Sequence, residues 1–365
     1  MLLFLLSVFC ITDGVLASES SDSITKNWVR QLIDCNFRIN DPSIRYPKFA
    51  KFCVKVYNWG DQTFNSYDTR YVVGTGDNWK FYGKNYNWMQ SYAYIFDLFK
   101  GEQVALHTNV NSDFGLSLNF MAVSIGYTWN VNRIFTGKAD DRKTFNFSFM
   151  CARFSAELLS WSTSGNTYIT KFGDYRPEHG RLRYDLNDVN QKALIFNAYY
   201  FFNNKKYAQG AAYSYSKYQL RSAGTWLLGV NYSKQDINMD FSGLPAEMRS
   251  HLPQLSDQYA FHYNDYAIMG GYAYNAVLPH NWLYNITALP SVGVKRSTLD
   301  EIDESGRRVK NMLSLNAQIK TSITYNHRSF FAAGLIRFDG GFFTGKDYSF
   351  FNSMESFSVL AGIRF

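Results

Sequence analysis

The strongest constraint on the fold is a strict alternation of apolar and polar residues between Leu313 and Tyr325. Because successive side chains of a β-strand point to opposite faces, the pattern predicts a strand with one apolar and one polar face. The polar face consists of Ser314, Asn316, Gln318, Lys320, Ser322 and Thr324. A soluble sheet has no need of so long a polar face backed by an apolar stripe. A strand between lipid and a polar barrel interior does need one.

Similar alternation recurs from Asn87 onward in runs of about ten residues, the length of a tilted strand that crosses a bilayer. The runs amount to roughly twelve to fourteen crossings, and we favour twelve because single-chain bacterial barrels have an even number. The sequence therefore predicts an all-β fold, an antiparallel transmembrane β-barrel of about 12 strands (roughly 10–14) in residues 76–365. The predicted long loops are Arg176–Asn190, Gln235–Asp265 and Arg296–Val309.

Composition favours strands over helices as membrane-crossing elements. Aromatic residues make up 18% of the chain, and charged residues also make up 18%. After the amino terminus, no segment has the ~20 consecutive apolar residues of a transmembrane helix. The net charge of +7 comes from Lys and Arg residues scattered along the chain, so nucleic acid is not a predicted partner.

The amino-terminal residues differ from the rest of the chain. An apolar run followed by Val15-Leu16-Ala17 predicts a secretory signal peptide over residues 1–17. Residues 18–75 are predicted to form a periplasmic segment with a short helix and strands. The predicted strands are Phe52–Tyr57 and Tyr67–Val73.

Cysteine and histidine positions give no sign of a metal site or cofactor. There is no CxxC pair and no Cys/His spacing typical of a metal site, and we predict neither metal nor cofactor. Cys35 and Cys53 are the two cysteines that could form a disulfide in an oxidising periplasm, and the sequence leaves open whether they pair.

The last strand, Ser353 to Phe365, repeats the alternation. Its apolar face carries Phe357, Val359, Ala361, Ile363 and Phe365, and the other face is polar apart from Leu360. This strand resembles the closing strand of bacterial outer-membrane β-barrels. The resemblance implies that the terminal aromatic residue is part of a signal read by the barrel-assembly machinery. It also implies outer-membrane lipid and lipopolysaccharide as partners.

Four short segments carry a more specific resemblance: Tyr67–Val72, Asn197–Tyr207, Gln219–Trp226 and Gly271–Asn275. In order and character they are similar to the Bacteroidota family catalogued as domain of unknown function 4421, over about residues 40–365. That family has no assigned activity. The resemblance implies residence in a Bacteroidota outer membrane and supplies no catalytic residues.

Charged residues on the polar faces are predicted to line the barrel interior. These are Arg153, Glu157, Lys320, Arg337, Asp339 and Arg364. Arg153 and Glu157 are predicted to form an ion pair on a strand with a bulge near Met150, where the apolar parity changes. Such charges either satisfy one another in a plugged barrel or line a pore. We favour the first because side chains fill the interior of small barrels.

Three functions fit these observations. The favoured one is a narrow or plugged barrel in the bacterial outer membrane, with an envelope, transport or structural role and no enzymatic activity. An enzyme acting on lipid or lipopolysaccharide would need a nucleophile and a base at the outer rim. The six His residues are isolated in the sequence and there is no GxSxG motif, so only the fold can bring such groups together. A soluble periplasmic all-β protein is the second alternative.

Deleting Phe365 tests the predicted assembly signal. We expect several-fold less folded protein in the outer membrane, because the closing strand loses its terminal aromatic residue. The signal peptide should still be removed. Gel migration with and without heating measures folding, and Phe365→Tyr serves as the control that keeps an aromatic end. Normal assembly of the deletion variant would contradict the prediction.

Overall fold

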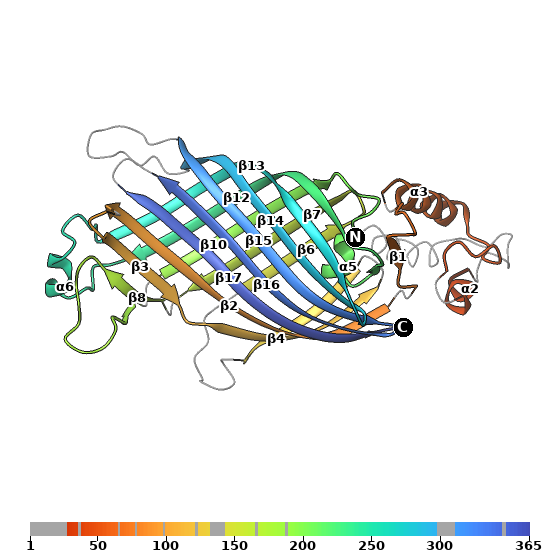
Figure 1. The fold of residues 1–365 in the computed structure, drawn as a ribbon, viewed down its shortest axis with the longest axis horizontal. Coiled ribbons are helices and arrows are strands. Elements are labelled where there is room, and N and C mark those ends of the chain that lie inside the picture. Colours follow the sequence, from red (N-terminus) through yellow and green to blue (C-terminus); the bar gives the residue numbers. More distant parts are fainter. Residues whose placement is uncertain are drawn as a thin grey trace, which may run out of the picture.

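A computed structural model of the 365-residue chain is nearly all β (Figure 1). It describes residues 28–35, 38–64, 66–76, 79–97, 99–120, 123–131, 143–164, 167–186, 189–297, 311–344 and 348–365. The helices are α2 (Trp28–Asp34), α3 (Lys48–Phe64), α5 (Gln209–Tyr213) and α6 (Ala246–Ser250). None of the helices in these ranges is long and apolar enough to span a membrane.

The strands confirm the predicted all-β antiparallel fold. They are β1 (Val72–Gly74), β2 (Trp79–Asp97), β3 (Glu102–Thr108), β4 (Asn111–Phe120), β5 (Val123–Asn130), β6 (Lys143–Met150), β7 (Phe154–Ser164), β8 (Thr167–Phe172), β9 (Tyr184–Leu186), β10 (Val189–Phe201), β11 (Lys217–Gln219), β12 (Ala223–Asp240), β13 (Gln258–Leu278), β14 (Trp282–Ser297), β15 (Asn311–His327), β16 (Phe330–Thr344) and β17 (Ser349–Arg364). One antiparallel sheet holds 15 of them, and β1 pairs separately with β11.

The order of the strands agrees with about twelve crossings. β2 pairs with β4 along its first half and with β3 along its second half, so β3 and β4 form one interrupted pass. Within the described residues, the passes are β2, β3 with β4, β5, β6, β7, β10 and β12 to β17.

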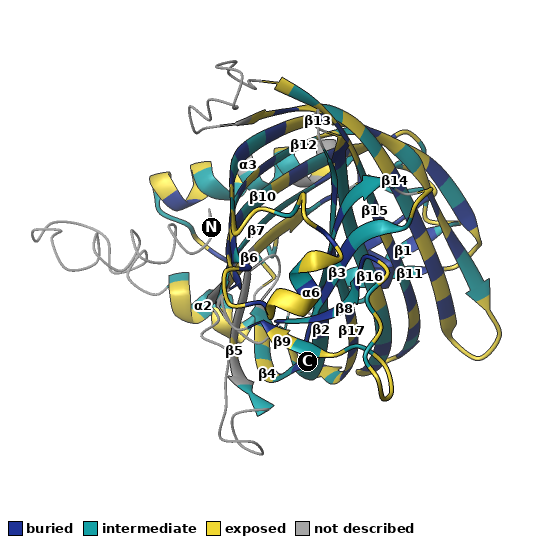
Figure 2. Cartoon of the chain, turned by 90° about the vertical axis from the view of Figure 1, so that its left-hand side faces the viewer, coloured by how far each residue is buried: buried dark blue, intermediate teal, exposed yellow. Residues whose placement is uncertain are grey.

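The first and last of these passes lie side by side. β17 pairs with β2 from Ser349 to Arg364. Beyond that ladder, the Trp79 N–H donates to the Phe365 carbonyl (3.0 Å), and the Phe365 N–H donates to the Trp79 carbonyl (3.1 Å). The sheet curls around an interior in Figure 2. We call the curled sheet the barrel and its interior the lumen.

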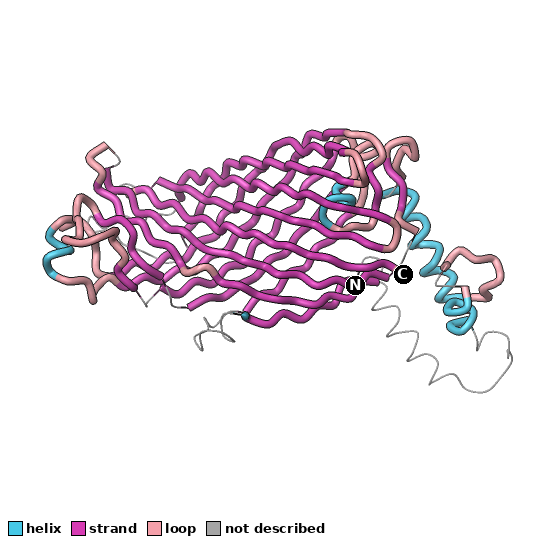
Figure 3. Tube along the Cα trace, turned by 60° about the horizontal axis from the view of Figure 1, so that its bottom comes forward, coloured by secondary structure: helices cyan, strands magenta, loops and turns pink. Residues whose placement is uncertain are grey.

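The two ends of the barrel differ (Figure 1). At one end, which we call the turn end, short turns at 279–281 and 328–329 join the passes, and the carboxyl terminus lies there. The other end, the loop end, carries α6 and the β8–β9 hairpin. Helices α2 and α3 lie outside the barrel, beyond the turn end (Figure 3). The predicted loop Gln235–Asp265 is too long, because both of its flanks continue as strand and only 241–257 connects them.

Side-chain burial follows the predicted alternation. On β15, Leu313, Leu315, Ile319 and Ile323 are exposed on the outer wall, while Ser314, Lys320, Ser322 and Thr324 are buried. On β17, the exposed residues are Phe357, Val359, Ala361, Ile363 and Phe365. Leu360, the apolar exception, faces inward and packs against Phe331. An apolar belt therefore covers much of the outer wall.

The interpretation of the run around Met150 as one bulged strand is wrong. A turn at residues 151–153 separates β6 from β7, and the two strands pair with each other. The Cys151 N–H donates to the Phe154 carbonyl at 3.0 Å. The change of parity therefore comes from reversal of the chain.

The predicted strand Phe52–Tyr57 is also wrong, because these residues belong to α3. The Lys51 N–H donates to the Pro47 carbonyl (2.9 Å), which places a proline at the start of the helix, where its missing N–H is no loss. Cys35 and Cys53, on either side of that helix start, are both free.

Glycines allow close contacts between strands of the barrel, and Gly271 is one of them. A Cβ on Gly271 would lie 1.9 Å from the Ala288 carbonyl oxygen on β14, whereas a Cβ on Gly270 would meet nothing nearer than 3.9 Å. We expect Gly271→Ala to destabilise the folded barrel by about 1–3 kcal/mol, the usual cost of overpacking. Gly270→Ala is the matched control. Denaturant titration followed by heat-dependent gel migration measures both, and equal stability of the two variants would refute the prediction.

Candidate functional site in the lumen

The turn end of the lumen is filled by residues 202–222, which connect β10 to β12 and fold inward. The buried residues Ala208, Ala211 and Ala212 pack with Val72 and Leu283. Strand β11 within this segment pairs with β1, so part of the amino-terminal region also lies against it. We call residues 202–222 together with β1 the plug.

Asparagine side chains of the barrel wall hold the plug in place. Asn275 Nδ2 on β13 donates to the Ala208 carbonyl at 2.9 Å. On β14, Asn285 Oδ1 accepts a hydrogen bond from the Tyr213 hydroxyl at 2.6 Å. Both Asn side chains are fully buried, and a buried amide is costly unless it is hydrogen-bonded. These hydrogen bonds therefore hold the plug in place and give the buried amide groups of the wall their partners.

Arg364 on β17 ties the plug to the closing strand. Its Nε donates to the Tyr215 carbonyl (3.1 Å), and one terminal nitrogen donates to the Arg328 carbonyl (2.7 Å). The guanidinium carbon lies 4.8 Å from the centroid of the Phe331 ring. These acceptors and this ring surround a side chain that is 1% exposed. The arrangement matches the need of a buried guanidinium for several partners.

Charged side chains from opposite walls meet in the middle of the lumen. Lys320 Nζ on β15 lies 2.6 Å from Glu157 Oε1 on β7, and Arg337 of β16 lies 3.3 Å from Glu157 Oε2. Arg337 also pairs with Asp339 on its own strand. Four strands separate β7 from β15 in the sheet, so these contacts cross the lumen. We call these four residues the ion network.

The structure thus brings together four of the six predicted lumenal residues. Arg364 is buried nearer the turn end, apart from the ion network. Arg153 lies in the turn before β7, and its carbonyl accepts from the Phe201 N–H at 2.7 Å. The predicted ion pair between Arg153 and Glu157 is wrong, because Glu157 pairs with Lys320 and Arg337 across the lumen.

Rings and aliphatic side chains fill the lumen near the loop end. Tyr94 is fully buried, with its ring centroid 4.7 Å from that of Tyr259 and 4.9 Å from that of Phe350. Met248 of α6 belongs to the same buried group. We call this group the aromatic cluster; its buried rings are Tyr92, Tyr94, Phe172, Phe241, Phe261, Tyr263, Phe343 and Phe350. Burial of each ring contributes about 1.5–3 kcal/mol, so the cluster is a major part of the core.

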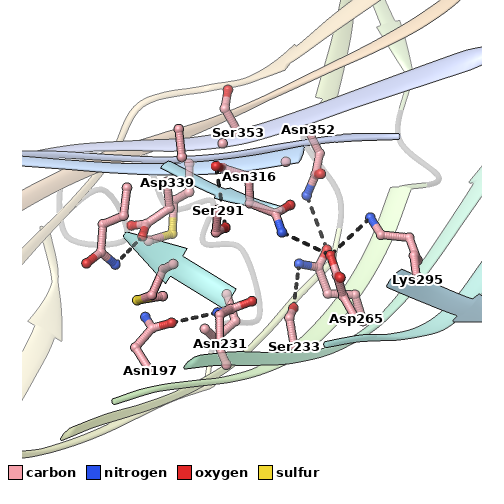
Figure 4. A pocket seen from close by; sticks show the side chains of 18 of the residues that line it. Asn197, Asn231, Ser233, Asp265, Ser291, Lys295, Asn316, Asp339, Asn352 and Ser353 are labelled. Carbon is pink, nitrogen blue, oxygen red and sulfur yellow. Dashed lines mark hydrogen bonds and ion pairs between the residues drawn. The ribbon is translucent and has the colours of Figure 1, made fainter. Parts of the chain in front are cut away.

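A cavity of about 70 Å³ separates the aromatic cluster from the ion network (Figure 4). Tyr92 and Tyr263 of the aromatic cluster and Asp339 of the ion network are among the residues that line it. Asp265 Oδ1 accepts from the Ser314 hydroxyl (2.6 Å) at the wall of this cavity. A polar cavity of this size suits a few hydrogen-bonded water molecules.

Further polar groups line this cavity. Lys295 Nζ lies 3.9 Å from Asp265 Oδ2 and 3.9 Å from the Tyr263 ring centroid. Two buried polar atoms, Trp161 Nε1 and Gln318 Oε1, have no hydrogen-bond partner among the described residues. An indole N–H and an amide oxygen are a donor and an acceptor, so the cavity offers both kinds of hydrogen bond.

Sequence reasoning missed the pair Asp265 and Lys295. Asp265 was assigned to a loop, although it shares the inward parity of Ala267 and Met269 on β13. Lys295 shares the inward parity of its strand in the same way. Extending the alternation one residue before Tyr266 on β13, and one residue after Val294 on β14, would have found both.

Two polar contacts outside the membrane-facing wall shift carboxyl pKa values. The Arg70 side chain beside Asp68 lowers the pKa of that carboxyl to about 2. At the loop end, His251 Nδ1 lies 2.7 Å from Asp174 Oδ1, and this hydrogen bond lowers the pKa of Asp174. Both carboxylates are therefore charged at neutral pH.

The described lumenal residues are arranged for packing and charge pairing. In that part of the chain no group of three or more His, Cys, Asp or Glu side chains could hold a metal ion. The charged groups of the ion network bind one another: Glu157 lies 2.6 Å from Lys320 and 3.3 Å from Arg337, and Arg337 also binds Asp339. Such an arrangement stabilises one conformation of the lumen.

Comparison with protein families identifies the chain. The family described as Domain of unknown function (DUF4421) matches residues 66–365. The chain belongs to this family. The match includes β1, the plug and every strand of the barrel sheet, and it begins after helices α2 and α3. A search of curated proteins found no match.

Solved barrels of the outer membrane show a distant similarity. The outer membrane protease OmpT from Escherichia coli is 10% identical, with 80% of this chain and 98% of that chain covered and a TM-score of 0.29. The beta domain of the Bordetella autotransporter BrkA is 12% identical, with 79% and 100% covered and a TM-score of 0.30. TM-scores this low carry no argument about activity.

Glu157→Gln tests the ion network. Removing the carboxylate leaves Lys320 and Arg337 with an uncompensated buried charge, so we expect a loss of about 3–5 kcal/mol in stability. Combining Glu157→Gln with Lys320→Met should cost less than the sum of the two single changes, because the pair is removed together. Denaturant titration of the refolded protein measures the three variants. Additive losses would contradict the cross-lumen contact.

Proposed function

We propose that this protein is an outer-membrane β-barrel with a plugged lumen and a structural role in the envelope. The observation that carries the proposal is the filling of the lumen by three successive layers. The aromatic cluster fills it near the loop end, the ion network crosses its middle, and the plug fills the turn end. Small barrels whose interior is filled by side chains have no water-filled channel.

The outer wall supports placement in a membrane. Large apolar side chains are exposed on neighbouring strands, among them Trp226, Ile268, Val292, Leu313 and Ile336. Exposed apolar surface of this extent is costly in water and favourable in lipid. A soluble periplasmic protein would bury such a surface, so the belt argues against that alternative.

The predicted export signal, over residues outside the described part of the chain, and the lengths of the connections support an orientation and a location for the barrel. With a cleaved signal peptide over residues 1–17, the turn end would face the periplasm and the loop end the outside, since short turns are typical of the periplasmic side. Lipid, lipopolysaccharide and the barrel-assembly machinery remain the predicted partners, and a Bacteroidota outer membrane the predicted location. The outward residues Phe357, Val359, Ala361, Ile363 and Phe365 would then face lipid next to β2.

Planar-bilayer recordings test the proposal. We expect no stable conductance from the folded full-length protein, because the three layers block the lumen. A variant that lacks residues 207–218 and carries Tyr94→Gly and Glu157→Gly opens all three layers and should conduct. Heat-dependent gel migration shows that both proteins are folded and inserted. Steady conductance of the wild-type protein would refute the plugged lumen and favour a pore or transport role.

A further inference from the structure

Polar side chains interrupt the apolar belt on one side of the outer wall. Six of them lie on the outward face of the neighbouring strands β17, β2, β3 and β4: Asn85, Asn87, Ser91, His107, Ser112 and Glu355. Their outward direction follows from the buried, lumen-facing neighbours Gln90, Tyr92 and Leu106. Polar groups that face lipid are costly, so a cluster of them calls for a functional explanation.

Three of these residues form a chain of contacts. His107 Nδ1 on β3 lies 3.0 Å from Ser91 Oγ on β2. The same hydroxyl lies 3.4 Å from Glu355 Oε2 on β17. Glu355 Oε1 in turn accepts from the Ser353 hydroxyl at 2.5 Å. A serine hydroxyl therefore lies between an imidazole and a carboxylate whose own position is fixed.

An apolar stretch of the outer wall and an exposed cation lie next to this cluster. On β17, the outward residues from Phe365 to Phe357 are apolar, and Glu355 is the next outward residue toward the loop end. Beside His107, the Arg183 guanidinium carbon lies 4.1 Å from the Tyr168 ring centroid, and Arg183 Nη2 donates to Asn109 Oδ1 at 2.8 Å. The cluster thus has an apolar surface for acyl chains on its turn-end side and an exposed cation beside His107.

We propose that Ser91, His107 and Glu355 form an ester-hydrolysing site on the outer wall, for acylated, phosphate-bearing lipids of the outer leaflet. The proposal rests on the outer-membrane placement proposed above and is independent of whether the lumen conducts. Ser91 is the nucleophile and His107 is its base, because the imidazole makes the shorter contact with the hydroxyl. Glu355 is a positioning residue.

The reaction needs only the lipid ester and water. Ser91 Oγ attacks the ester carbonyl carbon while its proton passes to His107 Nδ1. The bond between the carbonyl carbon and the alcohol oxygen then breaks, and the alcohol takes the proton from Nδ1. A water molecule next attacks the acyl-serine and gives a proton to Nδ1. Breaking of the acyl–Oγ bond releases the fatty acid, and Oγ takes the proton back.

The surrounding residues fit this role. Proton transfer makes the imidazole cationic, and the Glu355 carboxylate on the far side of the hydroxyl favours that charge. Arg183 is exposed and donates to Asn109, and its remaining N–H groups match a lipid phosphate, because a guanidinium offers several donors to phosphate oxygens. Acyl chains would lie along the apolar part of the outer wall on the turn-end side of the cluster. A filled lumen is compatible with such a site, since the substrate never enters the barrel.

Hydrolysis by the reconstituted full-length protein tests the site. Vesicles of phosphatidylethanolamine and phosphatidylglycerol with a labelled ester-linked acyl chain form one arm, and vesicles that contain lipid A form the other. We expect release of fatty acid in one arm or both. A fluorophosphonate probe should also label the protein. Ser91→Ala and His107→Gln should each lower the rate by about 100-fold or more, the usual contribution of a general base.

Three further variants make the test specific. Ser162→Ala on β7 is the matched control, because Ser162 is another half-buried serine. It lines a different pocket together with Lys192, so the rate and the labelling of this variant should be unchanged. Glu355→Gln should lower kcat with little change in KM, whereas Arg183→Ala should raise KM with little change in kcat. No labelling and no hydrolysis in either arm by folded wild-type protein would overturn the proposal. Activity that survives Ser91→Ala would overturn it as well.

Discussion

The separation of apolar and polar side chains by one hydrogen-bonded sheet is the constraint on which the rest of the structure depends. Apart from β5, β6 and β9, each strand of the sheet pairs on both sides within the described residues, so the two faces are free to differ completely in polarity. The inward faces carry charges such as Lys320 and Lys295, which need buried partners. Curling of the sheet supplies the partner of Lys320, since it brings Glu157 on β7 to Lys320 on β15, whereas Asp265 lies directly opposite Lys295 on the neighbouring strand. Charge pairing inside the lumen is therefore a consequence of the curled wall as much as a support for it.

The alternation made the fold and the inward residues predictable, and long-range geometry made the rest unpredictable. Parity alone placed Lys320, Arg337 and Asp339 on the lumenal side. It could not show that Glu157 meets them across the lumen, because the choice of partner depends on how the sheet curls. Asp265 was missed because the large outward apolar residues of β13 begin only at Tyr266, whereas the strand itself begins at Gln258. The plug was missed because Tyr213 and Tyr215 continue an alternating pattern while their backbone folds inward as α5 and a turn.

The plug shows how a connection becomes part of a core. Its backbone carbonyls would be unsatisfied inside the lumen, and wall side chains such as Asn275 and Arg364 donate to them. Strand β11 also pairs with β1, which extends this arrangement to a segment that precedes the barrel in the chain. The region around Val72 is thus structurally part of the barrel. The family match beginning at residue 66 follows the same boundary, and it leaves α2 and α3 outside.

Polar residues inside and outside the wall have different physical explanations. Inside, Glu157, Lys320 and Arg337 neutralise one another in a space that has to be filled, so packing accounts for them. Outside, packing does not require polar side chains at Ser91 or His107. Apolar side chains cover neighbouring parts of the same face, and apolar side chains at these two positions would cost less free energy in lipid. The contacts of Ser91 with His107 and Glu355 also depend on the register of three strands, which places them side by side. The outer-wall cluster therefore points to chemistry more strongly than the more heavily charged lumen does.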